Sequence, residues 1–173
     1  GLFSEEGVFS GDGLEEGLRE ISRRIIARML REGVAVVGVG YGLPGSVDAD
    51  EGRIIRSRSL GVANMRLAPT LCVEVPGGDL VEVPIALDND AICCAWGELH
   101  AARGGSPQSD LLVVLARRTE YHVGIGLGLI MGGAVQYGGK VANGEFYTSG
   151  WRGDSWSQTS LSASELIATA SVK

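Results

Sequence analysis

The stretch "ALDNDAICCAWGELHA", residues 86–101, joins an apolar segment, three polar residues and a helix-prone run. The longer string "LVEVPIALDND" is typical of a strand, and "AICCAWGELHAAR" of a helix. Asp88, Asn89 and Asp90 therefore stand where a strand becomes a helix. A helix N-terminus has free N–H groups and a partial positive charge, so any of the three could cap it. One cap needs one residue, so the same stretch also suits a ligand site, with Asn89 holding a hydroxyl and Asp90 accepting its proton.

Apolar periodicity outlines the elements around this junction. It predicts helices near 13–32 and 90–103 and strands near 34–40, 82–88, 111–117 and 124–137. Asp12 is expected to cap the first helix and Gly33 to end it, and residues 41–54 are expected to form a loop. Helices between apolar strands predict an α/β sheet covered on both faces. A hairpin turning at Gly132-Gly133 predicts that this sheet is mixed. Residues 60–80 are ambiguous, and "APTLCVEV" within them, residues 68–75, fits either a helix or a strand.

Composition bounds the class of protein. The 173 residues, 45% of them hydrophobic, suit one domain or one domain with part of another. A net charge of −6 argues against a nucleic-acid clamp within the chain. Three cysteines, two of them adjacent, do not form a disulfide framework, and the two histidines lack zinc-site spacing. We find no signal peptide or membrane span. Because the chain begins with Gly rather than Met, we expect it to be processed, tagged or cut from a longer protein.

Two further stretches are rich in glycine. In "GVGYGLPGSVD", residues 38–48, a strand runs into a Gly-Leu-Pro-Gly loop. This loop is either a tight turn or a ligand loop, because ligands of open α/β sheets gather at the carboxyl ends of strands. Gly124, Gly126 and Gly128 alternate along a second predicted strand, which lets another backbone or a phosphate come close. The pattern is not a dinucleotide fingerprint, because no helix follows it.

In order and spacing, these stretches resemble the ROK family, named for repressors, open reading frames and sugar kinases. "GVGYGLPGSVD" resembles the family's Gly-x-Pro-Gly-x-Val-Asp segment. "GIGLGLIMGG" followed by "GG…NGE" resembles the glycine-rich strands that end in Gly-Glu. "DNDAICCAWGE" resembles the Asn-Asp-Ala segment, with matches at Asn89, Asp90, Ala91, Gly97 and Glu98. The resemblance covers residues 14–146 and implies an actin-like, ribonuclease-H-like α/β fold with a sugar between two lobes.

The resemblance also implies a set of site residues. Asn89 and Glu145 would bind sugar hydroxyls, together with Asp90. In a kinase Asp90 would also be the base that activates the hydroxyl receiving phosphate. Gly124 and Gly126 would be the remnant of a phosphate loop, and no residue is assigned to a metal.

The sequence departs from the kinase pattern at both phosphate loops. The Asp-x-Gly-Gly-Thr loop is absent because the chain starts too late to include it. "LARRTEYHVGIG", residues 115–126, stands where a Gly-Thr-Gly loop is usual. Glu120, Tyr121 and His122 are bulky, and Glu120 would repel phosphate, whereas phosphate loops expose backbone N–H groups through small residues. Phe146 replaces the histidine that follows Gly-Glu, and the Cys-x-Cys-Gly zinc segment is missing.

Three readings of function follow. The first is the sugar-sensing portion of a ROK transcriptional regulator without kinase activity. The second is a truncated sugar kinase using ATP and magnesium, and the third is a structural relic. In the first reading there is no cofactor, and DNA is bound only by a domain outside this chain. We expect a cytoplasmic homo-oligomer with a small-molecule sugar and no membrane contact. Residues 1–110 would be part of the first lobe, and 111–173 the start of the second with an atypical tail, in an incomplete two-lobe arrangement.

Overall fold

The computed structural model describes residues 7, 9–75, 77–102, 110–118, 123–137, 148–152 and 155–159. The chain forms two compact units, Gly1–Asn89 and Asp90–Lys173, and each is treated by itself below. The lobe boundary predicted near residue 110 concerns the complete protein and stays a prediction.

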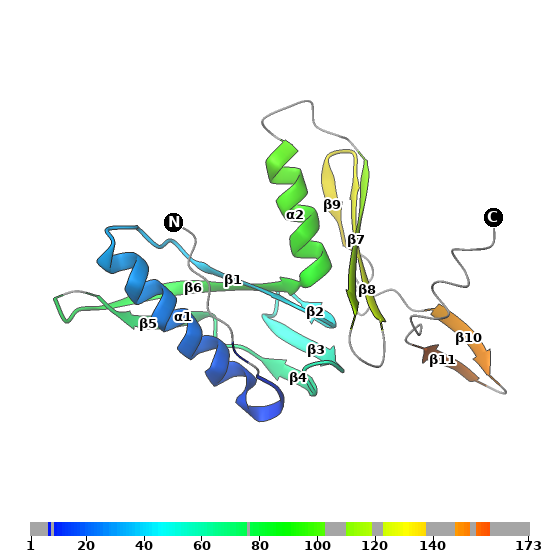
Figure 1. Cartoon of the computed structure of the whole chain (residues 1–173), viewed down its shortest axis with the longest axis horizontal. Coiled ribbons are helices and arrows are strands. Elements are labelled where there is room, and N and C mark those ends of the chain that lie inside the picture. Colours follow the sequence, from blue (N-terminus) through cyan, green and yellow to red (C-terminus); the bar gives the residue numbers. More distant parts are fainter. Residues whose placement is uncertain are drawn as a thin grey trace. The chain divides into compact units, whose positions relative to one another are not determined.

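The first unit combines a long helix with two small sheets (Figure 1). Its elements in chain order are η1 (Gly11–Gly13), α1 (Leu14–Arg31), β1 (Val39–Leu43), β2 (Ser46–Asp48), β3 (Arg53–Ser57), β4 (Val62–Arg66), β5 (Thr70–Glu74) and β6 (Leu80–Asn89). One sheet has the order β1-β6-β5, with β1 parallel and β5 antiparallel to β6. The other is the antiparallel meander β2-β3-β4. The sheet is therefore mixed, as predicted.

Helix α1 matches its predicted extent closely, but its beginning differs from the prediction. Gly33 follows the helix with a φ of 75°, a conformation that glycine adopts readily, so it ends α1 as expected. Asp12 is not the N-cap. A 3-10 turn, η1, precedes α1 and places Gly13 at the cap position, with no side-chain hydrogen bond there.

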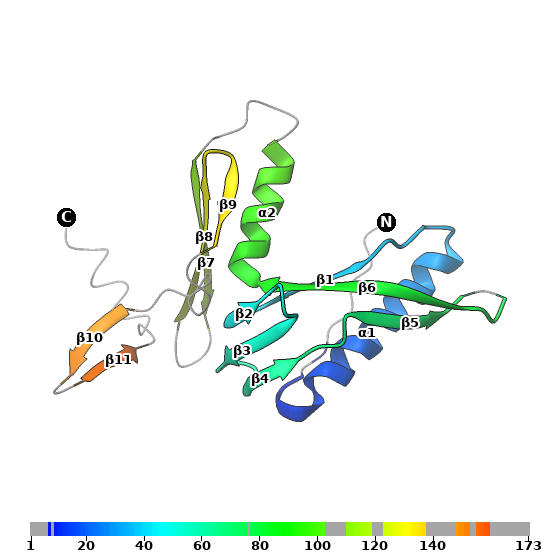
Figure 2. The same ribbon diagram turned by 180° about the vertical axis from the view of Figure 1, so that it is seen from behind.

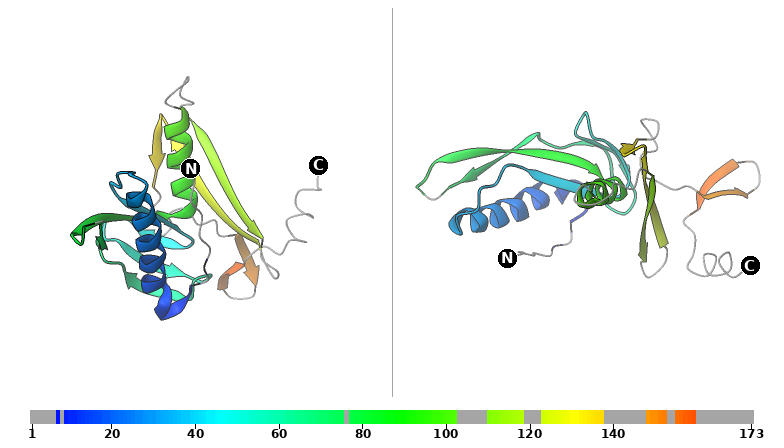
Figure 3. Two further views of the ribbon diagram at one scale, coloured as in Figure 1. Left: turned by 60° about the vertical axis from the view of Figure 1, so that its left-hand side comes forward. Right: turned by 90° about the horizontal axis from the view of Figure 1, so that it is seen from above.

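Helix α1 lies against one face of the β1-β6-β5 sheet (Figure 2 and Figure 3). The core of the first unit lies there and includes Val47, Ile54 and Val62 of the meander. Tyr41 and Leu43 of β1 are buried in this core, whereas Gly40 and Gly42, which alternate with them, are exposed. The same alternation holds in β5, where Leu71 and Val73 are buried. Strands of this period-2 pattern bury one face. The prediction of a sheet covered on both faces is thus wrong for the described part of the chain.

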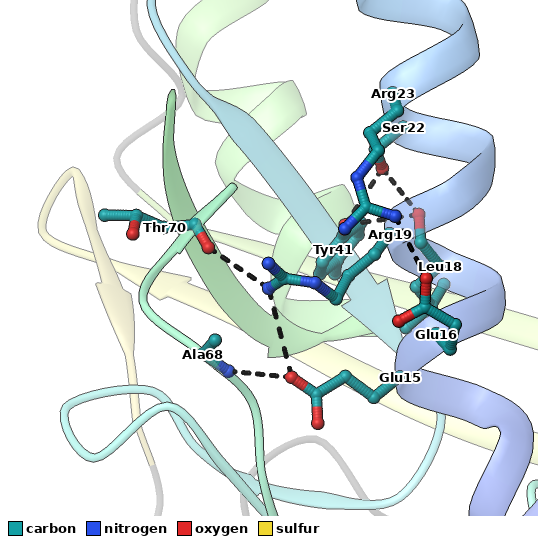
Figure 4. Close-up of polar contacts among 9 residues, drawn as sticks. All are labelled: Glu15, Glu16, Leu18, Arg19, Ser22, Arg23, Tyr41, Ala68 and Thr70. Carbon is teal, nitrogen blue, oxygen red and sulfur yellow. Dashed lines mark hydrogen bonds and ion pairs between the residues drawn. The ribbon is translucent and has the colours of Figure 1, made fainter. Parts of the chain in front are cut away.

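Polar contacts tie α1 to the chain around β5 (Figure 4). The Glu15 carboxylate accepts the backbone N–H of Ala68 at 3.2 Å. The Arg19 guanidinium donates to the Thr70 carbonyl at 3.1 Å and lies 4.0 Å from the Glu15 carboxylate. The helix is therefore held in register with the sheet by directional bonds as well as by apolar packing.

Two further predictions in this unit are wrong. The strand expected at 34–40 begins only at Val39, because pairing with β6 starts there, opposite Ile85. The upstream valines lack that pairing, and Val37 is 89% exposed. Residues 41–54, expected as a loop, contain the end of β1, all of β2 and the start of β3. Short strands separated by tight turns carry too little periodicity to be read. The ambiguous segment 60–80 forms strands rather than a helix.

The second unit is built around α2 and an antiparallel sheet. Its elements are α2 (Asp90–Ala102), β7 (Leu111–Arg118), β8 (Val123–Met131), β9 (Ala134–Gln136), β10 (Thr148–Arg152) and β11 (Ser155–Thr159). Strands β7-β8-β9 form one sheet and β10-β11 another. The hairpin turn at Gly132-Gly133 is confirmed, with φ of 58° and 74°. The mixed character predicted from this hairpin arises instead in β1-β6-β5, because every pairing of β8 is antiparallel.

One face of the β7-β8-β9 sheet packs against α2. Ile92, Ala95 and Leu99 are buried together with Ile130 and Val135 of the sheet. The opposite face carries exposed apolar side chains: Leu112, Val114, Leu129 and Met131. No helix in the described part of the chain is long and apolar enough to cross a membrane.

Candidate functional site

The strand–helix junction predicted from the sequence is present at residues 88–90. β6 ends at Asn89 and α2 begins at Asp90. The Asp88 carboxylate accepts the backbone N–H of Asn89 at 2.8 Å, and the Asp90 carboxylate accepts that of Ala91 at 3.0 Å. A carboxylate in the first turn also interacts favourably with the helix dipole. Asp90 therefore contributes to the first turn of α2, whereas the hydrogen bond of Asp88 lies within β6.

Asn89 has a different partner from its acidic neighbours. Its side chain is fully buried, with an exposed fraction of 0%, and Nδ2 donates to the Gly45 carbonyl at 3.0 Å. β1 and β6 run parallel with Leu43 opposite Asn89, so this bond joins the carboxyl ends of two adjacent strands. In α/β sheets that edge is where ligands bind. The sequence did not reveal this contact, because 44 residues separate its two partners.

The Gly-Leu-Pro-Gly stretch forms the turn from β1 into β2. Gly45 has a φ of 114°, which residues with a side chain rarely adopt. A Cβ at this position would lie 2.4 Å from the carbonyl oxygen of Arg56 and 2.9 Å from Cα of Ser57. Only glycine fits this turn, which lies directly against the backbone of β3. The stretch forms a tight connection at the same sheet edge as Asn89, and its role as a ligand loop stays a prediction.

The glycine-rich strand β8 owes one of its glycines to helix packing. A Cβ at Gly128 would lie 2.4 Å from the carbonyl oxygen of Ala91 and 2.7 Å from Cβ of Ala95. The backbone that comes close at this position is therefore that of α2. Gly124 and Gly126 pair with Arg117 and Leu115 of β7, respectively, and their role as a phosphate-loop remnant stays a prediction.

The remaining residues named from the sequence, and His100, one of the two histidines, fall into two groups. Glu145, together with Glu120, Tyr121, His122 and Phe146, lies outside the described residues. His100 is exposed in the last turn of α2. Among the residues that the structure describes, no group of three His, Cys, Asp or Glu side chains is placed to hold a metal ion.

Comparison with known proteins decides the family. The family model described as "ROK family" matches residues 5–146. The chain belongs to the ROK family. A glucokinase from Halalkalibacterium halodurans is 28% identical over 103 residues, which cover 60% of this chain and 28% of the glucokinase.

A solved structure of a ROK family transcriptional regulator, a homologue of the E. coli MLC protein, shares the fold. It superposes with a TM-score of 0.59 at 18% identity, over 93% of this chain and 40% of the regulator. This match confirms the predicted α/β fold of the actin-like class. The chain spans well under half the length of either relative.

Proposed function

We propose that this chain is the sugar-sensing portion of a ROK transcriptional regulator and has no kinase activity. The observation that carries the proposal is the stretch Thr119-Glu120-Tyr121-His122, which stands where kinases of the family need small residues around phosphate. Phosphoryl transfer depends on positioned phosphates and a metal. A carboxylate at this point repels phosphate, and bulky side chains replace the small residues that expose backbone N–H groups.

In the full protein, Asn89, Asp90 and Glu145 form the proposed sugar site. An amide offers both donor and acceptor, while two carboxylates accept, and this mixture suits the vicinal hydroxyls of a sugar. The position of Asn89 at the carboxyl edge of parallel strands supports the proposal. We further propose a cytoplasmic homo-oligomer that contacts DNA through a domain outside this chain.

The glucokinase relative favours a second candidate, an ATP-dependent sugar kinase. In that case Asp90 would be the general base for the sugar hydroxyl that receives phosphate, and ATP with magnesium would be the cofactors. The partly buried Asp90 at the start of α2 is compatible with either role.

One assay separates the two candidates. The intact protein is incubated with ATP, magnesium and a panel of hexoses, pentoses and N-acetylhexosamines, and ADP release is followed with a coupled enzyme. We expect no sugar-dependent turnover. Sugar-dependent turnover that disappears in Asp90→Asn would establish the kinase and refute the proposal. Background ATP hydrolysis that is equal in the wild type and in Asp90→Asn would be consistent with the proposal.

A further inference from the structure

The outward face of the β7-β8-β9 sheet is apolar and exposed within the part of the chain that the structure describes. Leu112 is 55% exposed, Val114 55%, Leu129 39% and Met131 54%. An exposed apolar patch of this kind is typical of an interaction surface. We propose that residues 162–172 form an amphipathic helix that covers this face. The inference concerns the second unit alone and does not depend on the proposed function.

The register of the strands shows that the outward face is uniformly apolar. In antiparallel strands, side chains that lie directly opposite each other point to the same side of the sheet. The outward pairs of β7 and β8 are Leu112 with Leu129, Val114 with Leu127, and Ala116 with Ile125. None of these side chains is charged or polar, so the face offers apolar packing and no ion pair.

The inward face of the same sheet already has its cover. Helix α2 packs there through Ile92, Ala95 and Leu99, which follow one another at helical spacing. Strands that are apolar on both faces are typical of sheets that are covered on both sides. The outward face is therefore expected to bind a second apolar element, and a helix is the element that the inward face accepts.

The segment with the matching pattern is "SASELIATASV", residues 162–172, which lies outside the described residues. Ala163, Leu166, Ile167 and Ala170 follow the spacing i, i+3, i+4 and i+7, which predicts one apolar face of a helix. The polar residues fall outside this stripe: Ser162, Ser164, Glu165, Thr169 and Ser171. Ser162 with Glu165 three residues later is the pattern of a capping box, which favours a helix that begins there.

The predicted helix and the sheet face agree in length. A helix of residues 163–172 is about 15 Å long at about 1.5 Å a residue. Along β8 the distance from Ile125 to Met131 is about 20 Å at about 3.3 Å a residue. The chain between Tyr137 and Ser162 can reach any point of the face, because an extended chain spans about 3.3 Å a residue. The segment is therefore long enough to cover the face and does not extend beyond it.

The first experiment measures whether the segment and the face are coupled. Thermal unfolding is recorded for the full chain and for a chain shortened to residues 1–160, each with and without Leu129→Gln. In the full chain, Leu129→Gln is expected to lower the Tm by about 5 °C, because the covered face receives an amide without a partner. In the shortened chain the face is exposed, and the same substitution should change the Tm by less than about 2 °C. An equal change in both chains would overturn the inference.

The second experiment keeps the chain at full length. Ile167→Glu places a charge on the apolar stripe, and the matched control Ala168→Glu places the same charge on the neighbouring residue, which points away from the stripe. Hydrogen–deuterium exchange of the peptides covering β7 and β8 is expected to rise about tenfold in Ile167→Glu, because the cover loses a buried apolar side chain. Ala168→Glu should exchange like the wild type. Equal exchange in the two variants would refute the proposal.

Light scattering distinguishes the segment from a second copy of the chain as the cover. If the segment of the same chain covers the face, Leu129→Gln leaves the molecular mass in solution equal to that of the wild type. A mass that falls in Leu129→Gln would mean that a second copy covers the face, and would overturn the inference.

Discussion

Gly128→Ala tests whether the glycine-rich strand is shaped by the packing of α2. The added Cβ would lie 2.4 Å from the Ala91 carbonyl oxygen and 2.7 Å from the Ala95 Cβ. Ordinary contacts begin about 1 Å farther out, so the helix must shift by a substantial fraction of that distance. Overpacking of this kind costs about 1–3 kcal/mol. For a chain of this size that corresponds to a fall in Tm of roughly 2–12 °C.

The matched control is Gly97→Ala, on α2 itself. A Cβ at Gly97 meets nothing within 4 Å and the residue is exposed, so the substitution should stabilise the helix by up to about 1 kcal/mol. Urea unfolding followed by far-UV circular dichroism measures both variants. Gly128→Ala should lower the free energy of unfolding, and Gly97→Ala should raise it. If Gly128→Ala is as stable as the wild type, the close approach of α2 to β8 is wrong.

Three further outcomes are expected. Arg19→Ala should lower the free energy of unfolding by about 1–2 kcal/mol in urea titrations, because it leaves the Thr70 carbonyl without its guanidinium donor. An unchanged urea midpoint would contradict a stabilising contact between Arg19 and Thr70. Gly45→Ala should be destabilised by more than about 2 kcal/mol, since steric contact adds to a strained φ, whereas Gly40→Ala, where a Cβ meets nothing, should change stability little. Purified protein should show no sugar-dependent ADP release, and Asp90→Asn should leave the background rate of ATP hydrolysis unchanged.

The sequence predicted the long elements and the junction well. Helix α1 has an unbroken apolar stripe and a glycine stop, and residues 80–102 change from a strand pattern to a helix pattern at Asn89-Asp90. The apolar period predicts these elements because each of them buries one face. The family resemblance, carried by the Asn-Asp-Ala segment and the two glycine-rich stretches, was confirmed by the family model.

What the sequence did not reveal depends on long-range contacts. The start of β1 is set by its pairing with Ile85 rather than by the run of valines. The bond from Asn89 to Gly45 joins residues far apart in the chain, and its existence depends on the parallel register of β1 and β6. The need for glycine at Gly128 is set by the crossing of α2, which a strand pattern does not encode.

The most direct test of the account is calorimetry of the intact protein against the sugar panel. At least one sugar is expected to bind, and Asp90→Asn and Glu145→Gln should each weaken its binding about tenfold or more, because a site built to hold a hydroxyl loses about 1–3 kcal/mol when one partner is removed. Circular dichroism of each variant should match the wild type. A sugar that binds with the same affinity to the wild type and to both variants would contradict the assignment of this site.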